Sequence, residues 1–190
     1  DDQPCLADKA INHPDEAIAL VAAPTPELAA LAMEHILIDV TEDTPCLDME
    51  ASTTLAGKEL LMERGDLDAA FAKADHIIEG RYTSGIQEQM YIEPQGMLAI
   101  PQDGGGIMLK GSLQCPYYVH RAVKRLLGFD DQQVTIIQAV TGGGFGGKEE
   151  YPSMIAGHAA LLALKAQRPV KLIYDRSEDL RATTKRHASI

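Results

Sequence analysis

Residues 140–150 read VTGGGFGGKEE, with five glycines around one phenylalanine, followed by a lysine and two glutamates. Glycine has no Cβ, so this run lets the backbone approach a ligand closely and adopt conformations that other residues avoid. Residues 132–140 before the loop have strand character, a mostly apolar helical pattern follows at 149–167, and residues 169–175 again have strand character. The order strand, glycine loop, helix, strand predicts a βαβ-like unit.

A phosphate-binding P-loop is the first interpretation of these glycines. Gly142, Gly147 and Lys148 fit the spacing G-x-x-x-x-G-K. The next position must carry the hydroxyl of Ser or Thr to hold Mg²⁺, and here it is Glu149. A carboxylate at that position would face phosphate oxygens, so we reject a P-loop.

A dinucleotide site is the second interpretation. Gly142, Gly144 and Gly147 satisfy G-x-G-x-x-G between an expected strand and an expected helix. Asp175 ends the next expected strand, where an acid could bind a ribose hydroxyl, but it follows Gly147 by 28 residues against the roughly 20 that the fingerprint favours. A Rossmann-type NAD(P)-binding oxidoreductase therefore stays open as an alternative.

The composition predicts a globular protein that binds neither nucleic acid nor membrane. The 190 residues are 45% hydrophobic, contain no apolar run long enough to span a bilayer, and carry a net charge of −11. Three cysteines, Cys5, Cys46 and Cys115, are odd in number and far apart, which argues against a disulfide framework or a zinc site. Reduced cysteines favour a cytoplasmic location. The start, DDQPCLADK, has neither an initiator Met nor a signal sequence, and we expect a piece of a longer protein.

The acidic charge is concentrated in the first third of the chain. Residues 1–70 carry 16 acidic and 3 basic residues, whereas residues 71–190 carry 12 acidic and 14 basic ones. This asymmetry predicts two units with different surfaces.

The pattern of apolar residues and turn residues predicts the following elements. Residues 16–23 and 36–40 have strand character and flank a helix that Thr25 can cap. The stretches 76–85 and 87–101 read as strands, and QDGGG at 102–106 reads as a hairpin turn. A helix begins at Pro116 and stops at Gly128, and Ser177 can cap a last helix.

Several segments, in order, resemble the molybdenum hydroxylases, the xanthine dehydrogenase and aldehyde oxidase family. GGGFGGKE at 142–149 resembles the loop that lies against molybdenum in that family, and GSLQCPYYVHRAVKRLLG at 111–128 resembles its glutamine-bearing strand end and helix. YIEPQGMLAI at 91–100 resembles the tyrosine–aliphatic–Glu–Pro strand, although the family often has His just before it and this chain has Gln89 and Met90. Residues 4–34 and 168–187 resemble the flanking segments.

The resemblance implies a mixed α/β (α+β) fold, with the tail of a small α/β domain followed by the N-terminal part of the molybdopterin-binding domain. We expect residues 1–55 to be that tail, 56–70 a connector, and 71–190 the start of the molybdenum domain. The family hydroxylates a purine, a related N-heterocycle or an aldehyde with oxygen from water. It passes electrons to iron–sulfur and FAD domains or subunits, usually within an oligomer. We expect this chain alone to be inactive and to bind no cofactor, because the general base and further cofactor loops match nothing in it.

The resemblance also assigns roles to site residues. Gln114 matches the glutamine whose amide donates a hydrogen bond to a molybdenum ligand, where an ordinary bond to the backbone is the alternative. Gly144, Phe145 and Gly146 match the segment against the cofactor, with Phe145 as an apolar wall or a core anchor. Glu149 matches a substrate contact of the purine-oxidising members, although an acid in the first turn of a helix is also common.

Two neighbouring charged residues receive no role in catalysis. We assign Glu150 the position in the first turn of the following helix, and Lys148 a structural or solvated position. A non-catalytic assembly module remains a further alternative for the whole chain, and it would tolerate the loss of Gln114.

Overall fold

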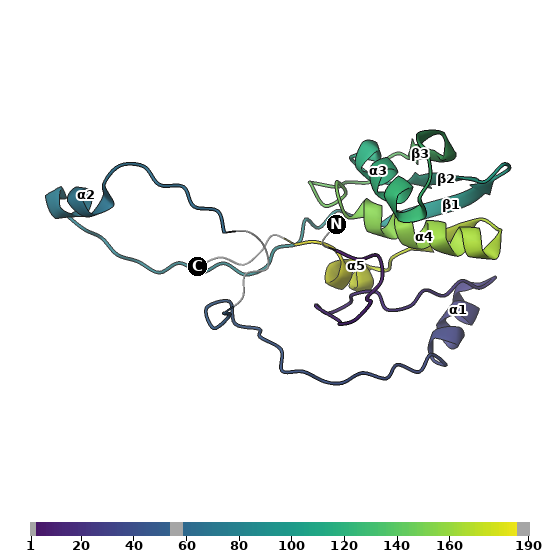
Figure 1. Cartoon of the computed structure of the whole chain (residues 1–190), viewed down its shortest axis with the longest axis horizontal. Coiled ribbons are helices and arrows are strands. Elements are labelled where there is room, and N and C mark those ends of the chain that lie inside the picture. The colour runs from purple at the N-terminus through teal and green to yellow at the C-terminus, as the bar shows by residue number, and fades with distance from the viewer. Residues whose placement is uncertain (1–2, 54–58, 186–190) are drawn as a thin grey trace. The chain divides into compact units, whose positions relative to one another are not determined.

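The computed structural model describes residues 3–53 and 59–185 of the chain. Its described residues divide into two compact units, one formed by residues 3–35 with 84–185 and the other by residues 36–53 with 59–83. The first unit holds the sheet and the glycine loop (Figure 1). The predicted domain limits at 55 and 70 stay a prediction, and residues 56–58 of the expected connector lie outside the described part.

A four-stranded mixed sheet forms the framework of the first unit. Its strands are β1 (Gly96–Gln102), β2 (Gly106–Gly111), β3 (Val134–Gln138) and β4 (Val170–Ile173), arranged in the order β3-β2-β1-β4. Strands β1 and β2 form the predicted antiparallel hairpin; β4 pairs antiparallel with β1, and β3 pairs parallel with β2.

Two helices, α3 (Pro116–Leu127) and α4 (Pro152–Ala166), pack against each other and against this sheet (Figure 1). Alternate residues of β1 and β2 are fully or almost fully buried, which is the pattern of a sheet with one face on the core. The core also takes in Val119 and Val123 of α3 and a row of alanines of α4. Small alanines let α4 approach the sheet closely, and the predicted mixed α/β class is confirmed.

The helix ends show which sequence signals were correct. Thr25 caps α1 (Pro26–Met33) by accepting from the Leu28 amide, and Gly128 ends α3 in the left-handed conformation, as predicted. The predicted cap at Ser177 is wrong. Helix α5 (Arg176–Ala182) is instead capped by Asp175, whose carboxylate accepts from the Glu178 amide.

The expected strands at 16–23, 36–40 and 76–85 do not form ladders in the described part of the chain. A strand is stable only when a neighbouring strand takes up its backbone groups, and periodicity cannot supply that neighbour. Leu37, for instance, is 96% exposed. The second unit instead contains the unexpected helix α2 (Leu67–Lys73), which Asp66 caps.

Strand β1 is also shorter than the predicted strand at 87–101, because it begins only at Gly96. Met90 has a positive φ of 53° and residues 92–93 form a bend. Among the described residues, none of the helices combines the length and apolar character needed to cross a membrane.

Candidate functional site

The glycine loop connects β3 to α4 and turns back sharply at its centre. The Gly147 amide donates to the Gly144 carbonyl at 2.7 Å, with Phe145 and Gly146 at positive φ of 50° and 89°. Gly144 is buried, and a Cβ there would lie 2.3 Å from Oε1 of Gln114. Gly146 has open space around it and needs its positive φ instead. The loop therefore exposes bare backbone at Gly146 and packs bare backbone against Gln114 at Gly144.

Gln114, between β2 and α3, is bound to this loop at three points. Its amide N–H donates to the Lys148 carbonyl at 2.7 Å. Its side-chain Oε1 accepts from the Gly146 amide at 3.1 Å and from the Lys148 amide at 3.2 Å. Two N–H donors can face only the oxygen of the amide, so the orientation of the side chain is fixed.

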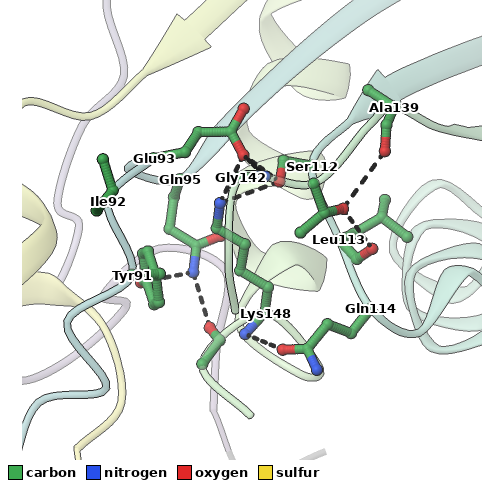
Figure 2. Close-up of polar contacts among 12 residues, drawn as sticks. Tyr91, Ile92, Glu93, Gln95, Ser112, Leu113, Gln114, Ala139, Gly142 and Lys148 are labelled. Carbon is green, nitrogen blue, oxygen red and sulfur yellow. Dashed lines mark hydrogen bonds and ion pairs between the residues drawn. The ribbon is translucent and has the colours of Figure 1, made fainter. Parts of the chain in front are cut away.

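The nitrogen of the Gln114 amide consequently points away from Lys148 (Figure 2). Its Nε2 donates to no partner among the described residues. A half-buried amide with its oxygen occupied and its nitrogen free is a directed hydrogen-bond donor.

Lys148 lies under the loop and is fully buried. Its ammonium lies 3.0 Å from Oε2 of Glu93 and 3.0 Å from the Ser112 hydroxyl, and 4.8 Å from the centre of the Tyr91 ring. The structural interpretation of Lys148 is confirmed, and the solvated one is wrong. An ammonium enclosed in this way cannot reach the phosphates of a nucleotide, which agrees with the rejection of a P-loop.

The Glu93 carboxylate accepts three hydrogen bonds through Oε2: from the Ser112 hydroxyl at 2.6 Å, the Gly142 amide at 2.7 Å and Lys148 (Figure 2). Partial burial raises the pKa of Glu93, but the bonds from Ser112 and Gly142 and the charge of Lys148 outweigh it and lower the pKa below its usual value. Glu93 is therefore an anion that holds the start of the loop.

A second buried network supports the end of the loop. The Tyr91 hydroxyl donates to Asp179 at 2.6 Å, and Gln95 donates through Nε2 to the Tyr91 oxygen at 3.0 Å and to the Gly147 carbonyl at 2.8 Å. Burial and then the neighbouring Asp179 carboxylate raise the pKa of Tyr91 far above its usual value, so the phenol stays protonated.

The topology around the loop differs from that of a dinucleotide-binding fold. Strands β3 and β4 lie at opposite edges of the sheet, and the two strands between them form an antiparallel hairpin. Helix α4 begins at Pro152, so Gly147 does not open the helix as the last glycine of the fingerprint does. Asp175 caps α5 and is thereby occupied.

A family model described as the molybdopterin cofactor-binding domain matches residues 50–190. The chain belongs to this family. It is 35% identical to the nicotinate dehydrogenase large molybdopterin subunit of Eubacterium barkeri, in an alignment that covers 98% of the chain and 46% of that relative. It is 34% identical to a probable xanthine dehydrogenase subunit of Bacillus subtilis, where the alignment covers 98% of the chain and 26% of the relative. The predicted membership of the molybdenum hydroxylases, a family of molybdopterin-dependent oxidoreductases, is confirmed, and the chain spans less than half of each of these relatives.

Solved structures share the fold of this molybdopterin-binding domain. Quinoline 2-oxidoreductase from Pseudomonas putida 86 superposes with a TM-score of 0.84 over 96% of this chain and 25% of its own, at 23% identity. Aldehyde oxidoreductase from Desulfovibrio gigas gives the same TM-score over 98% of this chain and 22% of its own, at 24% identity.

The residues around the loop fit a molybdopterin cofactor. The exposed backbone at Gly146, next to the buried Gly144, permits close approach of a large planar group, and the free Nε2 of Gln114 suits the oxo and thiolate ligands of molybdenum, which accept hydrogen bonds. Phe145 is 77% exposed, so the alternative in which it anchors the loop in the core is wrong.

Glu149 and Glu150 are both exposed and precede α4. The expectation that Glu150 lies in the first turn of the helix is wrong, because Tyr151 is the N-cap residue and the first turn holds no acid. Glu150 lines a hollow of about 550 Å³ together with Arg125 and Ser153.

The sequence reasoning missed the supporting residues Glu93, Ser112, Tyr91, Gln95 and Asp179. Three of them stand in YIEPQ, so the family resemblance of that segment was the available signal. Asp179 gave no signal, since it comes from a helix 88 residues after Tyr91.

Proposed function

We propose that this chain supplies part of the molybdopterin site of a xanthine dehydrogenase-like molybdenum hydroxylase. Such an enzyme hydroxylates a purine, a related N-heterocycle or an aldehyde with oxygen derived from water. The bound cofactor supplies a redox-active metal that takes two electrons from the substrate. The chain's own residues would hold and orient that group and exclude water from it.

The observation that carries the proposal is the orientation of Gln114. Two loop amides occupy its Oε1, so its Nε2, which has no partner among the described residues, is available to donate to a bound group. Gly144 and Gly146 would provide the backbone surface beside the cofactor, and Phe145 an apolar side chain that excludes water. Together they form a site with a hydrogen-bond donor, a glycine backbone surface and an apolar side chain.

An N-heterocycle is the favoured substrate class. Two of the relatives are named for nicotinate and xanthine, both N-heterocycles, and a structural neighbour is named for quinoline. Glu149 offers an exposed carboxylate one residue after the loop's lysine, and a carboxylate can accept the N–H groups of such a ring or take part in proton transfer.

Iron–sulfur and FAD subunits or domains are the proposed electron partners, since the electrons taken from substrate must leave the site. Two relatives are named as subunits, which supports an assembly of several chains. We place the enzyme in the cytoplasm, and we expect residues 1–190 alone to be inactive.

The test is the cofactor content of the complete enzyme that carries this chain. Molybdenum and pterin per mole of protein are measured for the wild type, for Gln114→Ala and for Gln102→Ala, a glutamine at the hairpin turn. We expect about a ten-fold loss of molybdenum in Gln114→Ala and none in Gln102→Ala, which is typical of an outer-shell partner of a metal. A wild type without molybdenum, or full retention in Gln114→Ala, would contradict the proposal.

A further inference from the structure

One carboxylate oxygen of Glu93 binds both ends of the glycine loop. Oε2 accepts from the Gly142 amide at 2.7 Å and lies 3.0 Å from the Lys148 ammonium, and these two residues begin and end the segment 142–148. The Glu93 amide also donates to the Gly142 carbonyl at 3.3 Å. Oε2 of Glu93 thus links the first and the last residue of the loop, and this contact point is called the junction below.

The end of β2 is attached to the same junction. The Ser112 hydroxyl donates to Oε2 of Glu93 at 2.6 Å and accepts from Lys148 at 3.0 Å. Ser112 is 5% exposed and stands two residues before Gln114. The three side chains therefore fix the loop relative to the strand end that carries the amide donor.

Lys148 contacts both this junction and Gln114. Its side chain reaches Glu93, while its backbone N–H donates to Oε1 of Gln114 and its carbonyl accepts from the Gln114 amide. A fully buried ammonium is stable only with its counter-charge. The loop cannot shift without moving either that charge or the bonds that orient the amide.

We infer that the Lys148–Glu93 pair, with Ser112, is a positioning device that sets the direction of the Gln114 amide toward the cofactor. Lys148 and Glu93 do not act on substrate themselves; they act through the loop and Gln114. This inference rests on the proposed function, because it needs a cofactor for the amide to meet.

The test combines Lys148→Met with Gln114→Ala in the complete enzyme. Methionine keeps most of the apolar stem of lysine and removes the ammonium, with its charge and its hydrogen bonds to Glu93 and Ser112. We expect the molybdenum and pterin content of Lys148→Met to be about ten-fold lower than that of the wild type. This is the range found for residues that orient a metal's partners. We also expect its Mo(V) electron paramagnetic resonance signal to broaden. The double variant should hold no less cofactor than Gln114→Ala alone, because Lys148 acts through that amide.

Lys124→Met is the matched control. Lys124 lies on α3, away from the loop, and the substitution breaks the ion pair between its ammonium and the Asp131 carboxylate, which are 2.6 Å apart. Its cofactor content and resonance signal should match the wild type. Losses that multiply in the double variant, or a Lys148→Met enzyme with wild-type content and signal, would overturn the inference.

Two other results would also decide between the interpretations. If Lys148→Met does not yield folded protein, Ser112→Ala decides: a broadened signal with reduced content supports the positioning role, and a wild-type signal overturns it. If the wild type itself carries no molybdenum, the proposed function fails first, and that result differs from a failure confined to the variants.

Discussion

The Lys148 ammonium and the Glu93 carboxylate lie 3.0 Å apart, yet the lysine side chain is fully buried and the glutamate side chain is 43% exposed. Removal of Glu93 should therefore have a different effect on stability from removal of Lys148. A buried ammonium without a counter-charge cannot be hydrated, whereas water can reach a half-exposed carboxylate.

We predict that Glu93→Gln lowers the free energy of unfolding by about 3 kcal/mol, because it leaves the buried charge unpaired. Lys148→Met should cost only about 1 kcal/mol, because solvent screens the carboxylate that remains. The double variant should be more stable than Glu93→Gln alone. Denaturant unfolding of the four proteins, wild type included, measures this cycle. Equal losses in both single variants would show that the difference in exposure does not govern the energetics.

Gly144→Ala tests the close approach between the loop and Gln114. A Cβ at this position would lie 2.3 Å from Oε1 of Gln114, a distance that real contacts do not allow. The amide or the loop must move, so we predict loss of most of the bound molybdenum and a stability cost of about 2 kcal/mol, as for overpacking of a core.

Gly85→Ala is the control for this substitution, because no atom lies within 4 Å of a Cβ there and its φ is not in the positive range. It should leave both the cofactor content and the unfolding midpoint unchanged. Full cofactor content in Gly144→Ala would show that the loop tolerates displacement and that close packing on Gln114 is not required.

The sheet and the helices of the first unit could be predicted because their signals are local. Glycines in the turn marked the hairpin, and Pro116 and Gly128 marked α3. The strands expected at 16–23 and 36–40 failed because a strand needs a partner, and its apolar run does not say where that partner lies.

The sequence singled out the glycine run by its composition and Gln114 by the family resemblance, and their roles beside a cofactor stay a prediction. The contacts of Glu93, Lys148 and Asp179 could not be predicted, since each joins the residue to a segment far away in the sequence. Lysine and aspartate are most often solvated, so the full burial of Lys148 and Asp179 runs against the ordinary expectation for their type.

Tyr91→Phe tests the network that supports the end of the loop. The hydroxyl donates to Oδ1 of buried Asp179 and accepts from Nε2 of buried Gln95, so its removal takes one hydrogen bond from each. Oδ2 of Asp179 keeps the Gln95 amide and Nε2 of Gln95 keeps the Gly147 carbonyl, but Oδ1 loses its partner. We predict a loss of about 1–3 kcal/mol at pH 7, the cost of unsatisfied buried polar groups. Tyr117→Phe, at an 82% exposed position, should cost nothing measurable.

The pH dependence of the same variant is a separate readout. Burial and Asp179 raise the pKa of Tyr91 in the folded protein above the 10.0 of a free phenol, so the unfolded chain ionises first. Tyr91 therefore makes its full contribution to the free energy of unfolding below about pH 10, and this contribution is lost as the pH rises further. Tyr91→Phe should show a shallower decline in stability above pH 10 than the wild type. An identical decline would assign the alkaline sensitivity to other groups, such as buried Tyr174, whose pKa burial also raises.

Glu149→Ala tests the substrate class in the complete enzyme. If the exposed carboxylate meets the N–H groups of a purine, its removal should lower kcat/KM for hypoxanthine by about ten-fold or more, the cost of an unpaired charged hydrogen bond. An aldehyde offers no such donors, so its turnover should change by less than about two-fold on the same grounds. Glu150→Ala is the matched control, because it removes a neighbouring charge that is also exposed, and we expect both activities to persist. Unchanged purine turnover in Glu149→Ala would remove this residue from the substrate site. A parallel loss for both substrates, with molybdenum retained, would instead assign it a role in a step that the two reactions share.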